Sequence, residues 1–172
     1  MQQLPKQNAG FTLIELLVVT GITAMIMLTA TSMFATFLLS SARTNARRQL
    51  QAEGNEAIRR IEFVIRNAAE VESDCDSAGT NLGTLTLRTL DNTTESITVS
   101  SNKLTIGGQA ITSDNVRVQP LDGNPYFKCS KPGSGTTKYV DVYFRLNPAG
   151  GDYSTIAQDF KTTVQIRNTS FN

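Results

Sequence analysis

The chain has 172 residues, of which 40% are hydrophobic and 18% charged, a length that suits one domain of ordinary size and excludes a large multidomain enzyme. Histidine and tryptophan are absent, so Ser-His and Cys-His nucleophiles are excluded, and two cysteines cannot supply the four ligands of a zinc site. The net charge of +1 is too balanced for a protein that binds nucleic acid over its whole surface, and we expect no nucleic-acid partner on this ground.

Residues 11–39 form an apolar stretch in which Glu15 is the only charged residue, and the next charge is Arg43. As a helix, these roughly 29 residues would be about 43 Å long, against a bilayer hydrocarbon core of about 30 Å. The stretch therefore predicts a membrane-spanning helix, which we assign to residues 11–42, after a polar leader of residues 1–10.

Two features leave the fate and orientation of this helix open. A secretory signal has an apolar core of roughly 7 to 15 residues, about half this length, but a Ser-x-Ala site ending at Ala42 allows cleavage there as an alternative. The leader contains Lys6, whereas Arg43, Arg47 and Arg48 follow the span. The positive-inside rule therefore favours a cytoplasmic location for the residues after the span and not for the leader, or it favours neither orientation.

Glu15 is the unusual residue of the span. A carboxylate in an apolar helix costs on the order of 2.5 to 3.5 kcal/mol near the bilayer centre and less near its edge. Such a residue is a functional candidate by default. The alternative is an interfacial carboxylate that reaches water from the end of the span.

The segment GFTLIELLVV at residues 10–19 resembles the prepilin signature of type IV pilins and type II secretion pseudopilins. The shared features are a short polar leader that ends in glycine, then phenylalanine, and a glutamate five residues into the mature chain. The resemblance implies that a membrane prepilin peptidase and methyltransferase cuts between Gly10 and Phe11 on the cytoplasmic side and methylates Phe11. It also implies that the helix is retained and that everything after it is exported.

The same resemblance implies a role for Glu15 in assembly, because it would neutralise the Phe11 ammonium of a neighbouring subunit. The implied partners are other pilin or pseudopilin subunits and an inner-membrane assembly platform. The implied location is a single-pass inner-membrane protein that later enters a cell-surface or periplasmic filament, as a structural subunit and not an enzyme. The alternative is a membrane-anchored or secreted binding module that uses residues 11–39 only as an anchor or signal.

After the span, residues 43–72 contain no proline and show helical periodicity. Apolar residues recur at spacings of three and four; they are Leu50, Ala57, Ile58, Ile61, Val64, Ile65, Ala68 and Val71. The pattern predicts that the same helix continues as an amphipathic segment, with Gly54 as its weak point.

The other face of this segment is charged. Glu56 precedes Arg60 by four residues, a spacing worth about 0.2 to 0.5 kcal/mol in a helix. Glu62 precedes Arg66 by the same distance. The arginines are interpreted as a solvated helix face, with contacts to other subunits as the alternative.

Residues 73–172 are rich in Thr, Ser, Asn and Gly and contain short alternating stretches typical of strands. The predicted strands are 84–90, 96–100, 103–106, 109–112, 116–121, 138–146 and 162–168. The turn signals between them are Asp91-Asn92-Thr93-Thr94, Ser101-Asn102, Gly107-Gly108 and Gly150-Gly151. We predict one antiparallel sheet of five to seven strands, beginning as a meander and covered by the apolar stripe of the helix, which makes the fold class α+β.

This β-rich half also resembles minor pilins and J-type pseudopilins. The span contains Gly21 and no proline, with Ser32 near the position where many major pilins have a helix-kinking proline. The resemblance therefore favours a minor subunit.

The export implied by the resemblance would place Cys75 and Cys129 in an oxidising compartment, where we expect a disulfide. It would close a loop of roughly 54 residues and stabilise the fold by about 4 kcal/mol. Cys75 is expected just after the helix and Cys129 in a lysine-rich loop. Free thiols in a reducing compartment are the alternative.

Aromatic residues and three lysines, Lys128, Lys131 and Lys138, alternate in segment 126–139. Such a pattern suits single-stranded DNA, so these lysines are candidates for DNA or surface contact, with a plain solvated loop as the alternative. Asp74 and Asp76 lack the ligand spacing of a calcium loop. We therefore expect no catalytic residue, metal or cofactor.

Overall fold

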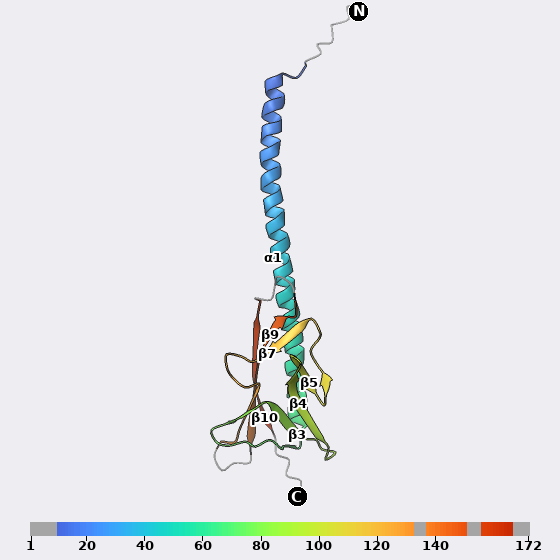
Figure 1. The fold of residues 1–172 in the computed structure, drawn as a ribbon, viewed down its shortest axis with the longest axis vertical. Coiled ribbons are helices and arrows are strands. Elements are labelled where there is room, and N and C mark those ends of the chain that lie inside the picture. Colours follow the sequence, from blue (N-terminus) through green and yellow to red (C-terminus); the bar gives the residue numbers. More distant parts are fainter. Residues whose placement is uncertain (1–9, 133–136, 151–155, 167–172) are drawn as a thin grey trace, which may run out of the picture. The chain divides into compact units, whose positions relative to one another are not determined.

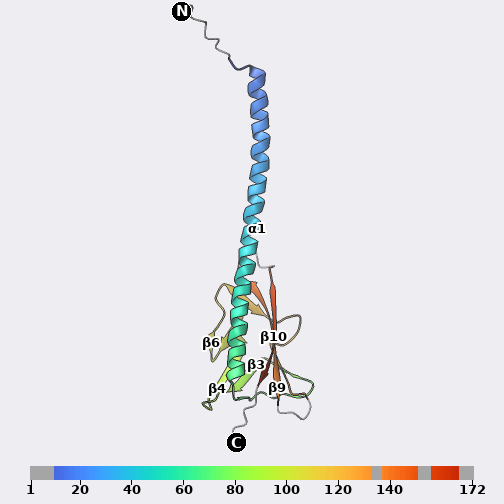
Figure 2. The ribbon, with the colours of Figure 1, turned by 180° about the vertical axis from the view of Figure 1, so that it is seen from behind.

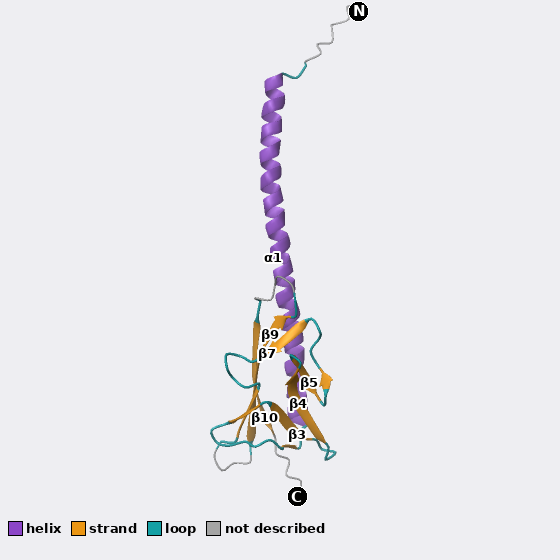
Figure 3. Ribbon diagram, viewed as in Figure 1, coloured by secondary structure: helices purple, strands orange, loops and turns teal. Residues whose placement is uncertain are grey.

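The computed structural model describes residues 10–132, 137–150 and 156–166, and it contains one long helix and ten strands in those ranges (Figure 3). The chain divides into two compact units, residues 1–42 and 43–172. Residues 1–9 of the predicted leader, and the end of the last predicted strand, lie outside the described residues.

Helix α1 comprises Leu13–Asn67, so it ends five residues before the predicted end at Glu72. The cause is strand pairing. The amide of Ala69 donates to a carbonyl of β3 (Thr84–Arg88) at 2.8 Å, and the next residues form β1 (Glu70–Val71), which pairs with β3. The sheet thus takes over backbone donors that a longer helix would have used.

In the first unit, the apolar side chains of the helix are exposed, and nothing in the described chain covers them. An 18-residue window of this part is apolar and long enough to cross a membrane. The hydroxyls on it donate to carbonyls three or four residues earlier; they belong to Thr20, Thr23, Thr29, Thr31, Ser32 and Thr36. Because these donors are satisfied within the helix, they do not prevent its burial in lipid.

The strands of the second unit form two antiparallel sheets (Figures 1 and 2). The first has the order β1-β3-β4-β5-β6, where β4 is Thr94–Ser100, β5 is Lys103–Ile106 and β6 is Gln109–Ala110. The second has the order β10-β9-β8-β2, with β10 at Gln158–Ile166, β9 at Lys138–Pro148, β8 at Phe127–Ser130 and β2 at Thr80–Leu82. Strand β7, Val116–Gln119, also pairs with β9.

The α+β class is confirmed, but the prediction of a single sheet is wrong. After β6 the chain leaves the first sheet, and β7 pairs with the far end of β9, where Val116 lies opposite Pro148. Strand β8, which the sequence did not predict, pairs with the other part of β9, where Phe127 lies opposite Val142. The predicted meander therefore ends at β6.

The hairpins of the first sheet follow the predicted turn signals. Ser101 and Asn102, between β4 and β5, have φ angles of 51° and 61°. Gly107 and Gly108, between β5 and β6, have φ angles of 56° and 80°. Two consecutive positive φ angles match the twist of paired strands and close these two-residue hairpins.

One core unites both sheets with the second part of α1. Figure 2 shows this part of the helix beside the strands. The buried helix residues are spaced by three or four positions; they are Leu50, Gly54, Ala57, Ile61 and Ile65. Buried sheet residues alternate along β3, β7, β8 and β9; in β9 they are Val140, Val142, Phe144 and Leu146. The helix stripe thus covers two sheets, not one.

Two glutamates attach the helix to the sheets by polar contacts at the margins of this core. Glu53 accepts hydrogen bonds from the amide and hydroxyl of Ser113 at 3.1 and 2.7 Å. Glu62 accepts one from the Thr162 hydroxyl of β10 at 2.6 Å, shorter than the 3.9 Å to its predicted partner Arg66. The helix position is therefore held by directional bonds as well as by burial.

Gly54 is a contact point and not the weak point that the sequence suggested. The ring of Phe160 lies so close that a Cβ on Gly54 would overlap three of its atoms. That ring is buried and stacks on Phe144 with centroids 5.2 Å apart, so it has little room to retreat. Glycine here allows the helix backbone to approach the sheet.

We predict that Gly54→Val lowers the free energy of unfolding by about 1 to 3 kcal/mol, because the new side chain overpacks the Phe160 contact. The measurement is denaturant unfolding of the full chain in detergent. Ala52→Val is the matched control, since Ala52 is an exposed residue of the same helix. A destabilisation by Gly54→Val no larger than that by Ala52→Val would contradict the close packing of Gly54 against Phe160.

Candidate functional site

The chain enters α1 through an N-terminal cap. Thr12 precedes the first helical residue, and its hydroxyl accepts a hydrogen bond from the Glu15 amide at 3.3 Å. Its carbonyl accepts the first helical bond, from the Leu16 amide, at 3.2 Å. Thr12 therefore satisfies backbone donors that the first turn would otherwise leave unpaired.

Glu15 occupies the first turn of the helix, three residues after this cap. The order Thr-x-x-Glu is a known N-terminal signature, in which a carboxylate also interacts favourably with the positive end of the helix dipole. Thr12 was not among the candidate site residues, although its spacing from Glu15 is visible in the sequence. The position in the first turn, at the positive end of the helix dipole, thus favours a carboxylate at this end of the apolar helix.

The bond between Gly10 and Phe11 lies before the helix, and both residues are exposed. An added Cβ at Gly10 would meet no atom within 4 Å. Within the described chain nothing therefore requires glycine at this position. Any requirement for glycine must come from a molecule that recognises the segment.

Cys75 and Cys129 form the expected disulfide, with Cα atoms 5.0 Å apart and a sequence separation of 54 residues. Cys129 is fully buried in β8, and not in a lysine-rich loop as expected. The bridge fastens the segment after α1 to β8. The carbonyl of Asp76 accepts the Lys131 amide at 2.8 Å beside it.

The three candidate lysines do not have equivalent surroundings. Lys138 is largely buried; its ammonium donates to the Val71 carbonyl at 2.7 Å and lies 3.5 Å from Glu70. The Lys128 side chain lies against Gly79. Lys131 lines a polar cleft that also contains carboxylates. Contact of these lysines with DNA or another surface stays an untested prediction.

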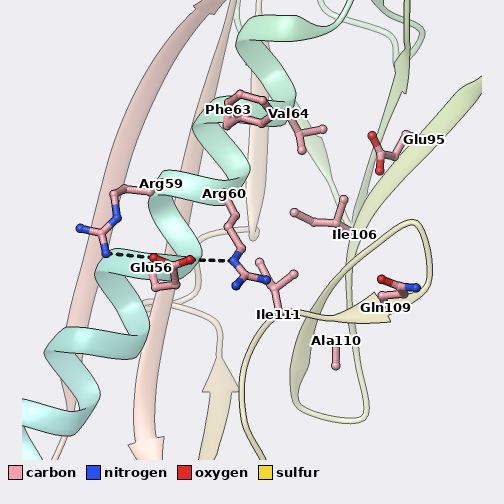
Figure 4. Close-up of a pocket in the computed structure, with 10 residues that line it drawn as sticks. All are labelled: Glu56, Arg59, Arg60, Phe63, Val64, Glu95, Ile106, Gln109, Ala110 and Ile111. Atoms are coloured by element: carbon pink, nitrogen blue, oxygen red, sulfur yellow. Dashed lines mark hydrogen bonds and ion pairs between the residues drawn. The ribbon is translucent and has the colours of Figure 1, made fainter. Parts of the chain in front are cut away.

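A second cleft lies between α1 and the β5–β6 hairpin, with a volume of about 470 Å³ (Figure 4). Its apolar lining comes from both sides and consists of Phe63, Val64, Ile106, Ala110 and Ile111. Its polar lining consists of Glu56, Arg59, Arg60, Glu95 and Gln109. We call this cleft the helix–hairpin groove.

The α1 wall of the helix–hairpin groove has more positive than negative charge. Glu56 lies 2.8 Å from Arg60 and 2.9 Å from Arg59, so one carboxylate serves two guanidinium groups (Figure 4). Hydrogen bonds from Arg60 and Arg59 hold the pKa of Glu56 below its usual value. The predicted pair of Glu56 with Arg60 is confirmed, and Arg59 is an additional partner.

Within the described ranges, no three cysteine or carboxylate side chains are grouped closely enough to hold a metal ion. Among the described residues, the titratable groups with shifted pKa values are paired surface charges or tyrosines. Tyr126, for example, has a raised pKa because it is partly buried.

Comparison with known proteins gave one match. Residues 5–31 match the family model described as the prokaryotic N-terminal methylation motif. No characterised protein and no solved structure matched the chain.

The match includes Gly10, Phe11 and Glu15 and supports a type IV pilin-like prepilin. A motif of this kind implies processing by a peptidase and assembly with other pilins, and the proteins that carry it are structural. Together with the uncovered apolar helix, it indicates anchoring in a membrane before assembly.

We predict that a thiol reagent labels neither cysteine in the denatured, non-reduced protein. Cys75→Ser should lower the free energy of unfolding by about 4 kcal/mol, because it opens the loop in the unfolded chain. Denaturant unfolding of the full chain gives this value. Under reducing conditions the variant and the wild type should have the same free energy of unfolding. Labelling of both cysteines without reduction would contradict the disulfide.

Proposed function

We propose that the chain is a structural subunit of a type IV pilus or of a secretion pseudopilus, processed between Gly10 and Phe11 and assembled through its N-terminal apolar helix. The observation that carries the proposal is the methylation motif at residues 5–31, which includes the start of an apolar helix that the described chain leaves uncovered. A helix of this kind needs lipid or other apolar helices around it.

The surroundings of the Gly10–Phe11 bond support processing there. The bond is exposed and precedes the helix, so a peptidase can reach it without unwinding α1. Cleavage would create an ammonium on Phe11, close in sequence to the Glu15 carboxylate. The methyltransferase activity associated with the motif would then act on Phe11.

Glu15 would select the stagger between neighbouring subunits. The surface of the span offers many axial positions of similar apolar contact, because its hydroxyls are already bonded within the helix. A buried charge without a partner is strongly unfavourable. The position that pairs Glu15 of one subunit with the Phe11 ammonium of its neighbour would therefore be selected.

A minor subunit is the more specific proposal. Its support is the resemblance of the β-rich half to minor pilins and J-type pseudopilins, together with the absence of proline from the span, where α1 is continuous. The proposed location is the inner membrane, followed by a cell-surface or periplasmic filament. The proposed partners are other pilins, a prepilin peptidase and an inner-membrane assembly platform.

The competing function is a membrane-anchored or secreted binding module. The mature amino terminus distinguishes the two, and mass spectrometry of the purified protein identifies it. A chain that starts at Phe11, and above all at methylated Phe11, supports the filament subunit. A chain that starts at Met1 or Arg43 supports the binding module and contradicts our proposal.

We predict that Gly10→Val yields an uncleaved precursor, heavier by the mass of residues 1–10, that stays in the membrane and is absent from filaments. An added Cβ at Gly10 meets no atom of the described residues, so a failure of processing would reflect recognition by the peptidase. Gln3→Val serves as the control within the leader and should mature normally. Normal maturation of Gly10→Val would count against the peptidase assignment.

We predict that Glu15→Ala reduces incorporation into filaments by roughly a hundredfold or more, since it leaves an ammonium buried without its partner at a cost of about 3 to 5 kcal/mol. Glu15→Gln should have the same effect, because it keeps the shape and removes the charge. The measurement compares subunit in sheared filaments with subunit in membranes.

Thr12→Ala is the matched control, because it removes the helix cap and keeps the charge. We expect it to assemble, with unchanged membrane levels. If Thr12→Ala failed as badly as Glu15→Ala, Glu15 would act through the first helical turn and not through the charge. Equal incorporation of Glu15→Ala and wild type would refute the role in stagger.

A further inference from the structure

Two large apolar side chains are exposed in the described part of residues 43–172, and they lie on different elements. Phe63 on α1 is 69% exposed, and Leu90, between β3 and β4, is 65% exposed. Single exposed apolar residues are ordinary on protein surfaces. These two differ because one lines a groove and the other occupies the end of a hairpin.

The helix–hairpin groove is suited to receive an apolar side chain. Phe63 and Val64 form its helix side, and Ile106 and Ile111 form the opposite side (Figure 4). Strand β6, of only two exposed residues, is the outermost strand there. Burial of these four side chains would remove apolar surface from water, which is the main favourable term in protein association.

The electrostatics of the groove favour a carboxylate partner on its helix side. Arg59 and Arg60 share the single carboxylate of Glu56, so this wall has one positive charge that Glu56 does not balance. Glu95 contributes its negative charge from the opposite wall, on β4 (Figure 4). An incoming acidic group is therefore attracted to the wall that also contains Phe63.

The β3–β4 turn presents the complementary combination. Leu90 is followed by Asp91, which is exposed and has no ion-pair partner among the described residues. The turn is held by hydrogen bonds between Thr89 and Thr93, with backbone atoms 2.8 Å and hydroxyls 2.7 Å apart, and Asn92 has a φ of 59°. A turn that is already ordered loses little conformational freedom on binding. We call residues 89–93 the hairpin tip.

We propose that the hairpin tip of one copy of the chain inserts into the helix–hairpin groove of the next copy, with Leu90 against Phe63 and Asp91 beside Arg59. The inference rests on the proposed filament function but not on the more specific proposal of a minor subunit, because it requires copies of the chain that are neighbours in the filament. It names the surfaces through which the β-rich units of such neighbours meet. The two surfaces are different patches of one molecule, so the contact is head-to-tail. A head-to-tail contact that does not close into a ring generates a helical filament.

The test is directed cross-linking in cells that assemble the filament. One copy carries Leu90→Cys and a second, differently tagged copy carries Phe63→Cys, while the native cysteines remain bridged. Oxidation of sheared filaments should produce a dimer that contains both tags. Ser101→Cys with Phe63→Cys is the matched control, because Ser101 is exposed at the turn of the neighbouring β4–β5 hairpin, and this pair should give little dimer.

A charge exchange gives a second test that needs no cysteine. Asp91→Arg and Arg59→Glu should each lower incorporation severalfold, and the two variants expressed together should restore it to an intermediate level or better. Leu90→Asp should lower incorporation by about thirtyfold, as expected for an interface hot spot. Formation of the native disulfide in each variant verifies that the fold is intact.

The outcomes separate this inference from the proposed function. Filaments that contain the chain but give no dimer above the control, and no rescue by charge exchange, would overturn the hairpin-tip contact and leave the filament role standing. A cross-link from Phe63→Cys to a different filament protein would also overturn it. Absence of the wild-type chain from filaments would overturn the proposed function and this inference together.

Discussion

Burial of one helix stripe holds the β-rich unit together. Two sheets with separate strand orders share one buried cluster with the stripe of α1 from Leu50 to Ile65. Neither sheet could bury its inner face without that helix, because each is a single layer. The disulfide and the contacts of Glu53 and Glu62 then fasten the elements around this stripe. Gly54 belongs to the same contact, since only a residue without a side chain lets the Phe160 ring reach the helix.

The first part of α1 has the opposite property, because its apolar side chains are exposed along nearly the whole segment. Its hydroxyls are satisfied by the helix itself, so the segment presents a nearly uniform apolar surface. Such a surface associates readily with lipid or with copies of itself but defines no relative position. In the proposed filament, one charge pair supplies the missing specificity. Glu15 lies in the first turn, next to the cap at Thr12, where the positive end of the helix dipole stabilises its negative charge before assembly.

The two proposed contacts between subunits lie in different surroundings and have different roles in assembly. The pair of Glu15 and the Phe11 ammonium acts in an apolar surrounding, where a mismatch is costly, so it governs stagger. The hairpin tip and the helix–hairpin groove meet in water, where an apolar side chain supplies affinity and charges mainly guide orientation. Both contacts are head-to-tail, which is the symmetry that an open filament requires.

The sequence by itself determined the helical part of the fold and the motif. An uninterrupted apolar run, its helical continuation and the Gly-Phe-x-x-x-Glu order are local patterns, and they identified α1 and the family motif without a structure. Alternating strands and two-residue turns were also local, and β3 to β6 were predicted correctly except at their ends.

The tertiary structure decided those features that depend on residues far apart in the sequence. The two-residue β1 is a strand because β3 pairs with it, and two residues show no period. In β8, Phe127 and Cys129 alternate with polar residues, but the lysines around them suggested a loop, and the pairing with β9 makes this segment a strand. The division into two sheets followed from the pairing of β7 with β9, and the close approach at Gly54 and the helix–hairpin groove exist only where the helix meets strands far from it in the sequence.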